Sequence, residues 1–203
     1  MRDVTARGSV AARNGILPVF GFGQNDPKAI LGALAEAVSD LINDAELVKA
    51  NPNEFSITLE LAIRMGPYFR GWRVSPEWTR REEEEKRVAW DDEAGIRHLK
   101  KIRPDIIVHH MHQQDENLLV VEAKRIQNTS YDDDIRKLTL MTLDHSVDED
   151  FHYGYVVGVH LVMDLPNRRV VSNDVYSLGK VDNELTAWFS TVVAEMVRQK
   201  TPA

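Results

Sequence analysis

Cysteine is absent from the 203 residues of the chain. This absence excludes disulfide bonds, thiolate metal sites and a cysteine nucleophile, and it suits a reducing compartment. Long apolar runs are absent as well, since none approaches the roughly 20 residues that a membrane helix needs. The first residues also lack the apolar core of a signal peptide. We therefore expect a cytoplasmic protein that does not associate with membranes.

Positive charge is scarce relative to negative charge, because 25 Lys and Arg residues face 32 Asp and Glu residues, for a net charge of −7. Proteins that bind nucleic acid are more often basic overall, so this balance counts against a large phosphate-tracking surface. It is compatible with a local basic cleft, or with a site whose carboxylates hold cations. The hydrophobic share of 43% is ordinary for a globular domain that buries its own core.

Several familiar site motifs are missing. The run Gly21-Phe22-Gly23 is too short for a phosphate loop and no Gly-Lys-Ser/Thr follows it, and no Gly-x-Ser-x-Gly elbow occurs. Histidines at positions 109, 110 and 112 suggest a zinc site at first glance. Strand alternation, however, would turn His109 away from the other two, and no cysteine completes a tetrahedral set. A nucleotide loop, a serine-hydrolase triad and a zinc site are therefore disfavoured.

The organisation of the chain follows from its periodicities. Residues 1–25 mix Gly, Arg and small residues without a period, which predicts a flexible arm before a single domain over 26–203. Apolar residues at helical spacing, with Asp26-Pro27 as a start signal, predict helices over 26–42, 51–68, 132–145 and 183–200. Strands are predicted over 71–81, 151–165 and 168–178, with a hairpin over 103–125 and a solvated loop or edge at 82–85. This order predicts an α/β sandwich around a mixed sheet.

The hairpin stretch RPDIIVHHMHQQDENLLVVEAKR carries acidic residues that a plain hairpin does not need. Asp105 and Glu122 are symmetric about the point between Gln113 and Gln114, so a simple register places them opposite each other on antiparallel strands. A bulge or a longer loop would shift this pairing. Alternation also puts Glu122 and Lys124 on one face of the strand. Two carboxylates and an ammonium group are thus predicted to converge at one end of the sheet.

This convergence has a chemical use. Mg²⁺ prefers oxygen ligands, and it usually takes one or two carboxylates together with water and substrate phosphate. A metal ion held by Asp105, Glu122 and the Ala123 carbonyl would lower the pKa of a bound water. Lys124 would orient that water or stabilise charge in the transition state. The alternative is a charged strand end without chemistry, and the apolar run with its partner Asp105 weakens that alternative.

Pro104-Asp105 followed by Glu122-Ala123-Lys124 resembles the PD-(D/E)xK nuclease superfamily, which has the restriction-endonuclease-like fold. An ordered set of motifs over roughly residues 51–165 is similar to a group of small bacterial and phage proteins in that superfamily. The set is Asn53–Thr58, Val74–Trp78, Arg103–His109, Asn117–Lys124, Asp134–Leu138 and Tyr153–Tyr155.

The resemblance implies a three-layer α/β/α core with a central mixed sheet, and a Mg²⁺-dependent deoxyribonuclease for which Mn²⁺ can substitute. It assigns catalysis to four residues: Glu54, Asp105, Glu122 and Lys124. It assigns the metal to Asp105, Glu122 and Ala123. Glu54 matches a glutamate on the first core helix, with Glu60 as a weaker candidate. A competing interpretation makes Glu54 a capping-box glutamate at the third helical position after Asn51.

Three further residues are candidates for substrate contact: His109, Glu77 and Lys137. Glu77 would otherwise pair with a nearby arginine, and Lys137, like Arg136, would otherwise form a solvent-facing ion pair rather than bind phosphate. Four cations are candidates for a cleft mouth, namely Arg97, Lys100, Lys101 and Arg103. DNA is the expected partner. The rival hypothesis is a catalytically silent nuclease-like module that binds nucleic acid or a partner protein, and the sequence leaves open whether the chain forms a homodimer.

Overall fold

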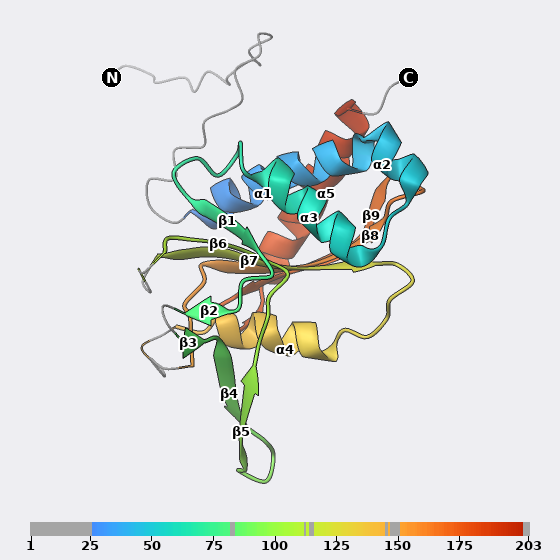
Figure 1. Ribbon diagram of the computed structural model, residues 1–203. Coiled ribbons are helices and arrows are strands. Elements are labelled where there is room, and N and C mark those ends of the chain that lie inside the picture. The colour runs from blue at the N-terminus through green and yellow to red at the C-terminus, as the bar shows by residue number, and fades with distance from the viewer. Residues whose placement is uncertain are drawn as a thin grey trace, which may run out of the picture.

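A computed structural model describes residues 26–81, 84–111, 113, 116–144, 146 and 151–200, so the arm predicted at 1–25 lies outside the described residues. At its centre is a six-stranded sheet with the order β1-β6-β7-β8-β9-β10 (Figure 1). Strands β7 and β8 run parallel, and the other neighbours run antiparallel. The strands are β1 (Arg73–Pro76), β6 (Ile106–His109), β7 (Asn117–Arg125), β8 (Val157–Asp164), β9 (Arg169–Ser177) and β10 (Lys180–Val181).

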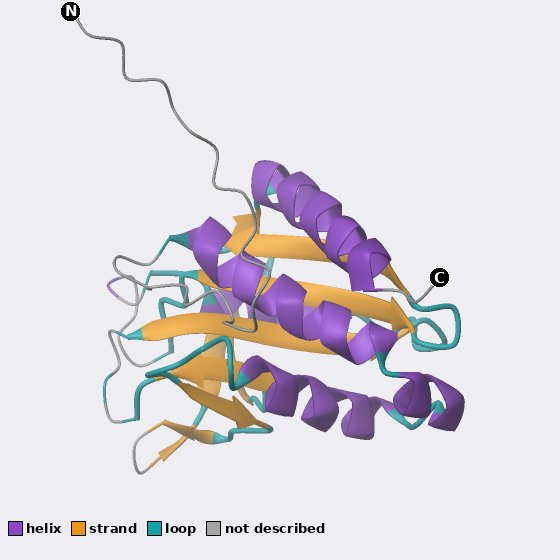
Figure 2. Cartoon of the chain, turned by 90° about the horizontal axis from the view of Figure 1, so that it is seen from above, coloured by secondary structure: helices purple, strands orange, loops and turns teal. Residues whose placement is uncertain are grey.

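Helices cover both faces of this mixed sheet. The helices are α1 (Pro27–Asn43), α2 (Ala45–Ala50), α3 (Glu54–Met65), α4 (Asp132–Met141) and α5 (Asn183–Lys200). On one face lie α1, α3 and α5, whereas α4 lies on the opposite face (Figures 1 and 2). Each face has its own apolar core: Ile106 and Val108 belong to the core with α1, α3 and α5, and Ile107 and Val120 belong to the core with α4. The α/β architecture with a mixed sheet is the predicted one.

Helix α1 starts as the sequence predicts, with the Asp26 carboxylate accepting the Lys28 amide hydrogen at 3.0 Å and Pro27 at the first helical position. Both α3 and α5 pack against it. Its large apolar residues from Ile30 to Ile42 are consequently removed from solvent altogether. The two ends of the described chain also meet here, since the Asn43 side-chain amide donates to the Val197 carbonyl of α5 at 3.2 Å.

The segment between β1 and β6 departs from the prediction. The strand expected over 71–81 ends at Pro76, and Glu77 then takes a left-handed conformation with φ of 53°. The chain continues into a small separate sheet of β2 (Arg80–Arg81) and β3 (Glu84–Glu85), so the edge, rather than the loop, is the alternative found at 84–85. Proline lacks the amide hydrogen that a longer strand would need, and Pro76 is accordingly found on an edge strand.

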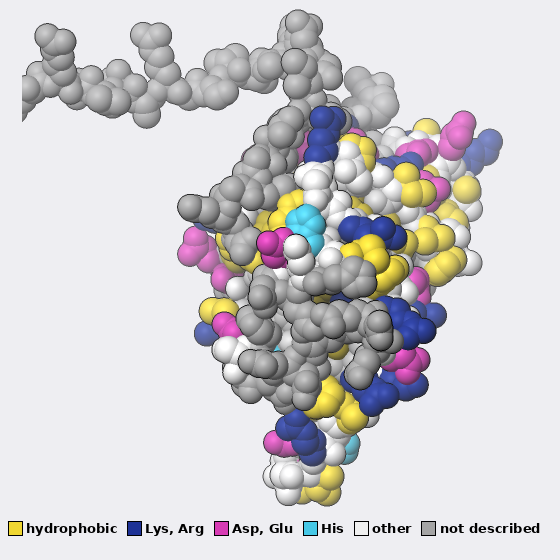
Figure 3. Space-filling view, turned by 60° about the vertical axis from the view of Figure 1, so that its left-hand side comes forward, with side chains coloured by type: hydrophobic (Ala, Val, Ile, Leu, Met, Phe, Trp, Pro, Cys, Tyr) yellow, Lys and Arg dark blue, Asp and Glu magenta, His cyan; other side chains and the backbone are white. Residues whose placement is uncertain are grey.

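A second hairpin, of β4 (Arg87–Asp91) and β5 (Arg97–Lys101), was not predicted. It is not part of the main sheet, and it projects beyond it next to α4 (Figure 1). The space-filling view shows basic and apolar side chains at this projecting end of the molecule (Figure 3). Its strands carry a majority of exposed residues, so they lack the apolar alternation that marks a strand in the sequence.

Candidate active site

The hairpin of β6 and β7 has the predicted register at the site. Ile106 pairs with Val121 and Ile107 with Val120, and a bulge lies toward the turn, after Val108. Because the bulge is at the far end, the pairing at Asp105 and Glu122 is not displaced. The Asp105 carboxylate accepts the Ala123 amide hydrogen at 2.8 Å, which fixes this residue just before β6 against the end of β7.

Asp105, Glu122 and Lys124 share the sheet face that α4 covers. Ile107 and Val120 both belong to the core beneath α4, and strand alternation places Asp105 on the same face as Ile107, and Glu122 and Lys124 on the same face as Val120. Ion pairs from both strand residues to α4, described below, agree with this placement. The predicted convergence of two carboxylates and an ammonium group is therefore present in the structure.

Glu122 is completely buried, and its two carboxylate oxygens have different surroundings. Oε2 pairs with the Lys137 ammonium of α4. Oε1 has no hydrogen-bond partner among the residues that the structure describes. Burial first, and then the nearby charge of Asp105, raise the pKa of Glu122 well above its ordinary value, although Lys137 opposes the shift. Burial likewise raises the pKa of Asp105. The site thus holds a buried carboxylate pair whose charge Lys137 compensates only in part.

Helix α4 contributes Asp134 and Lys137, one turn apart. Asp134 bridges the two lysines, with Oδ1 at 3.1 Å from Lys137 Nζ and Oδ2 at 3.1 Å from Lys124 Nζ. Burial alone would raise the pKa of Asp134, but the two ammonium groups outweigh it and the pKa is lowered. Lys137 is mostly buried, so the solvent-facing ion pair considered for it is wrong. Asp134 was not singled out as a site residue; its i,i+3 spacing from Lys137 was the available signal.

Glu54 stands at the first position of α3. The N-cap is Asn53, whose side chain accepts the Ser56 amide hydrogen at 2.9 Å, whereas Asn51 ends α2 in a left-handed conformation with φ of 42°. The alternative that made Asn51 the N-cap and Glu54 a capping-box glutamate at the third position is therefore wrong. Glu54 is left available for contacts outside its own helix.

Those contacts connect Glu54 to the end of β7. Its carboxylate accepts from Lys124 Nζ at 3.2 Å, from the Arg125 amide at 3.1 Å and from the Asn128 side chain at 3.3 Å. Lys124 consequently lies between two carboxylates, Glu54 and Asp134, which together outweigh its burial and raise its pKa. Glu60, the weaker candidate, is instead paired with Arg64 on its own helix.

Glu77 and His109 do not join this group. Glu77 pairs with Arg103, as the alternative for it anticipated, and its amide donates to the Asp105 carbonyl at 2.9 Å. His109 is buried, and its Nε2 shares a hydrogen bond of 3.2 Å with the Ser75 hydroxyl. His109 lies four residues along the chain from Asp105, which is about 13 Å in a strand. The neighbouring His110 contacts Trp72 instead.

His109 gives the fold a testable pH dependence. Burial, followed by the charges of Lys86 and Arg73, lowers its pKa to about 4. The folded protein therefore keeps this ring neutral while the unfolded chain protonates it below its ordinary pKa, so stability falls as the pH drops from about 6.5 toward 4. Between about pH 7.5 and pH 5, the wild type should lose about 2 kcal/mol more unfolding free energy than His109→Gln. Urea unfolding at both pH values measures this difference, and equal losses would contradict it.

Comparison with known proteins assigns no family to the chain. No family model, curated protein or solved structure matches the chain. In the described part of the chain, no helix is both long and apolar enough to span a membrane.

The residues of the site fit a divalent cation. Four carboxyl groups (Glu54, Asp105, Glu122 and Asp134) face two ammonium groups (Lys124 and Lys137). The N–H and C=O of a strand residue point to the same edge, so the Ala123 carbonyl faces the side where its amide meets Asp105. Over the described ranges, no three Asp, Glu or His side chains are arranged to hold an ion alone. Two carboxylates and one carbonyl, completed by water and phosphate, are a set that suits Mg²⁺.

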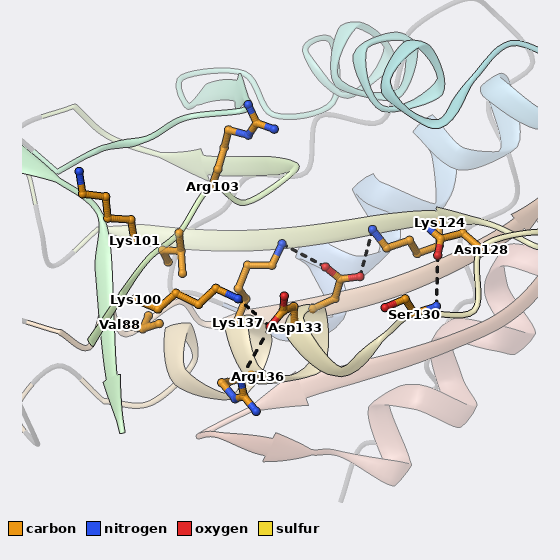
Figure 4. A pocket seen from close by; sticks show the side chains of 12 residues that line it. Val88, Lys100, Lys101, Arg103, Lys124, Asn128, Ser130, Asp133, Arg136 and Lys137 are labelled. Atoms are coloured by element: carbon orange, nitrogen blue, oxygen red, sulfur yellow. Dashed lines mark hydrogen bonds and ion pairs between the residues drawn. The ribbon is translucent and has the colours of Figure 1, made fainter. Parts of the chain in front are cut away.

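A cleft of about 390 Å³ leads to these groups. It is lined by Lys124, Asp134 and Lys137 on the side of the sheet and α4, and by Lys100 and Arg103 on the side of β5 (Figure 4). Of the cations predicted for a cleft mouth, three line it, namely Lys100, Lys101 and Arg103. Arg97 lies near the tip of the second hairpin and does not line it.

Proposed function

We propose that the chain is a metal-dependent nuclease that hydrolyses phosphodiester bonds in DNA, on a core of restriction-endonuclease-like type. The observation that carries the proposal is the convergence of Asp105, Glu122 and Lys124 on one sheet face, at a cleft lined by cations. A mixed sheet with helices on both faces supports the fold assignment.

The chemistry divides among these groups. Mg²⁺, when bound, activates a water molecule and neutralises charge on the phosphodiester. The Asp105 and Glu122 carboxylates and the Ala123 carbonyl hold the cation, for which the unpartnered Glu122 Oε1 is available. Lys124 stays cationic between Glu54 and Asp134, and it stabilises the negative charge that develops on the phosphate. Lys137 neutralises the second oxygen of Glu122.

Metal binding and cleavage test the proposal together. The purified chain should cut DNA in Mn²⁺ or Mg²⁺ and not in a chelator. In calorimetry, Asp105→Ala should weaken Mn²⁺ binding at least about tenfold, because one carboxylate leaves too few hard ligands. Asp133→Ala is the matched control: this acid lies beside Asp134 but is exposed and paired with Lys100, so it should bind Mn²⁺ as the wild type does. Equal binding by Asp105→Ala and the wild type would contradict the assigned ligands.

One observation favours a second candidate, the silent nuclease-like module that binds nucleic acid or a partner protein. Glu122 pairs with Lys137, and Asp134 bridges Lys137 and Lys124, so protein side chains neutralise part of the charge that a cation would otherwise neutralise. A protein that binds neither Mn²⁺ nor Mg²⁺ by calorimetry, and leaves every DNA form intact, would establish this candidate over the nuclease.

A further inference from the structure

The cleft is locally basic although the chain is acidic overall. Its walls present six cationic side chains and two carboxylates, Asp133 and Asp134. The cations are Lys100, Lys101, Arg103, Lys124, Arg136 and Lys137. A concave surface lined mostly by one sign of charge concentrates ligands of the opposite sign. The cleft therefore favours a polyanion despite the net charge of −7.

The outer cations form a path toward the site. Lys100, Lys101 and Arg103 stand on β5 and the short segment after it, directly before Asp105, with side chains that are 46%, 64% and 66% exposed. They pair with Asp133, Glu85 and Glu77, respectively. Ion pairs this exposed contribute about 1 kcal/mol or less, so a phosphate can replace their carboxylates at little cost.

The dimensions of the cleft select the form of the nucleic acid. A volume of about 390 Å³ is near the lower end of the range for a site that takes one small molecule, which corresponds to a nucleotide or so. Lys124, which is 12% exposed, lines this cleft together with Asp134 and Lys137, and Glu122 lies behind them with no exposed surface. Duplex DNA is stiff on this length scale and cannot bend one backbone into such a space, whereas a single strand can.

The second hairpin forms a wall of the cleft. Val88 of β4 belongs to the apolar core beneath α4, and the Arg136 guanidinium lies 4.6 Å from the centre of the Trp90 ring. At its far end the hairpin exposes Ile96 and Leu99, which are 59% and 52% exposed, close to the acidic residues Asp91, Asp92 and Glu93.

We propose that the strand bound in the cleft is single-stranded DNA. Its phosphates lie along Lys100, Lys101 and Arg103 toward Lys124. This inference rests on the proposed function, because it takes DNA as the substrate and the carboxylate site as the destination of the strand.

Binding without cleavage tests the inference. In a chelator, fluorescence anisotropy should show a labelled single-stranded oligonucleotide bound at least about tenfold more tightly than the same strand in a duplex. The triple variant Lys100→Ala/Lys101→Ala/Arg103→Ala should weaken single-strand binding. It should also make the negative slope of log K against log salt shallower by about two, since each lost phosphate contact removes about 0.7 from its magnitude. Lys28→Ala/Lys49→Ala/Arg198→Ala is the matched control, because it removes three cations from α1, α2 and α5 and should leave the slope unchanged.

The outcomes separate this inference from the proposed function. Duplex bound as tightly as single strand, or an unchanged salt slope in the cleft variant, overturns the inference even if the protein cuts DNA. Preferential single-strand binding with the predicted slope change supports the inference. If the metal-loaded protein then cuts neither form, the inference stands and the nuclease proposal fails.

Discussion

Replacing Lys124 with alanine should lower the rate of DNA cleavage by about 10²–10³, roughly 3–4 kcal/mol in the transition state. The ammonium group lies between Glu54 and Asp134 at the floor of the cleft, where low solvent access makes a fixed charge effective. Mn²⁺ binding should be retained or tightened, because an ammonium group is not a ligand and its removal leaves the site more negative. Single-turnover cleavage with saturating Mn²⁺, next to calorimetry, measures both effects.

The structure defines the controls for this variant. Lys124 pairs with the buried Asp134, so the variant must first be shown to be folded, by circular dichroism and urea unfolding. Asp134 keeps a second partner in Lys137, which limits the loss of stability. Lys28→Ala is a matched control that removes an exposed cation on α1, away from the cleft. A folded Lys124→Ala that cuts DNA as fast as the wild type would place the activity elsewhere.

The second large effect concerns stability. Without metal, Lys137→Met should lower the free energy of unfolding by about 3 kcal/mol at neutral pH, because the completely buried Glu122 loses the one cationic partner that it has among the described residues. This loss of stability has an upper limit, because the Glu122 carboxyl group can take up a proton instead of remaining charged. Protonation costs 1.36 kcal/mol for each unit by which the pH exceeds the ordinary pKa of the group. Urea unfolding in a chelator measures it.

A double variant isolates the pair. Lys137→Met/Glu122→Gln should recover most of the stability, since a neutral amide at position 122 does not need a cation. Arg136→Met is the matched control on α4, because it removes a half-exposed cation and should cost less than about 1 kcal/mol. If Lys137→Met proves as stable as Arg136→Met, the ion pair with Glu122 is not supporting the fold.

The β6–β7 hairpin was predictable because its signals are local. Two apolar runs of matched length flank one polar centre, so few registers bury both runs, and the observed one places Asp105 and Glu122 as expected. The β4–β5 hairpin was not predictable in this way, because it packs mainly against α4 and its strands carry few buried apolar residues. The cleft wall that this hairpin forms could consequently not be predicted from the sequence.

Two contacts of the site could not be predicted from local sequence patterns. Asn51 and Asn53 are both good N-cap residues, and the choice between them depends on Asn51 closing the short helix α2, for which the sequence shows no clear period. That choice moves Glu54 from a helix cap to a partner of Lys124. The pairing of Glu122 with Lys137 depends on where α4 docks on the sheet, which periodicity does not specify.

The packing of α1 against α5 bears on how the chain reaches this state. Asn43 and Val197 are joined by a hydrogen bond across 154 positions, and Lys200 reaches Glu36 and Asp40 of α1. Contacts this distant in sequence form late and slow folding. Helix α1 therefore remains only partly covered, by α3, until α5 has been synthesised on the ribosome. The residues of the site from Asp105 to Lys137 leave the ribosome well before α5. The carboxylate site, apart from Glu54, is thus assembled from residues close in sequence, whereas the cover of α1 requires the two ends of the described chain to meet.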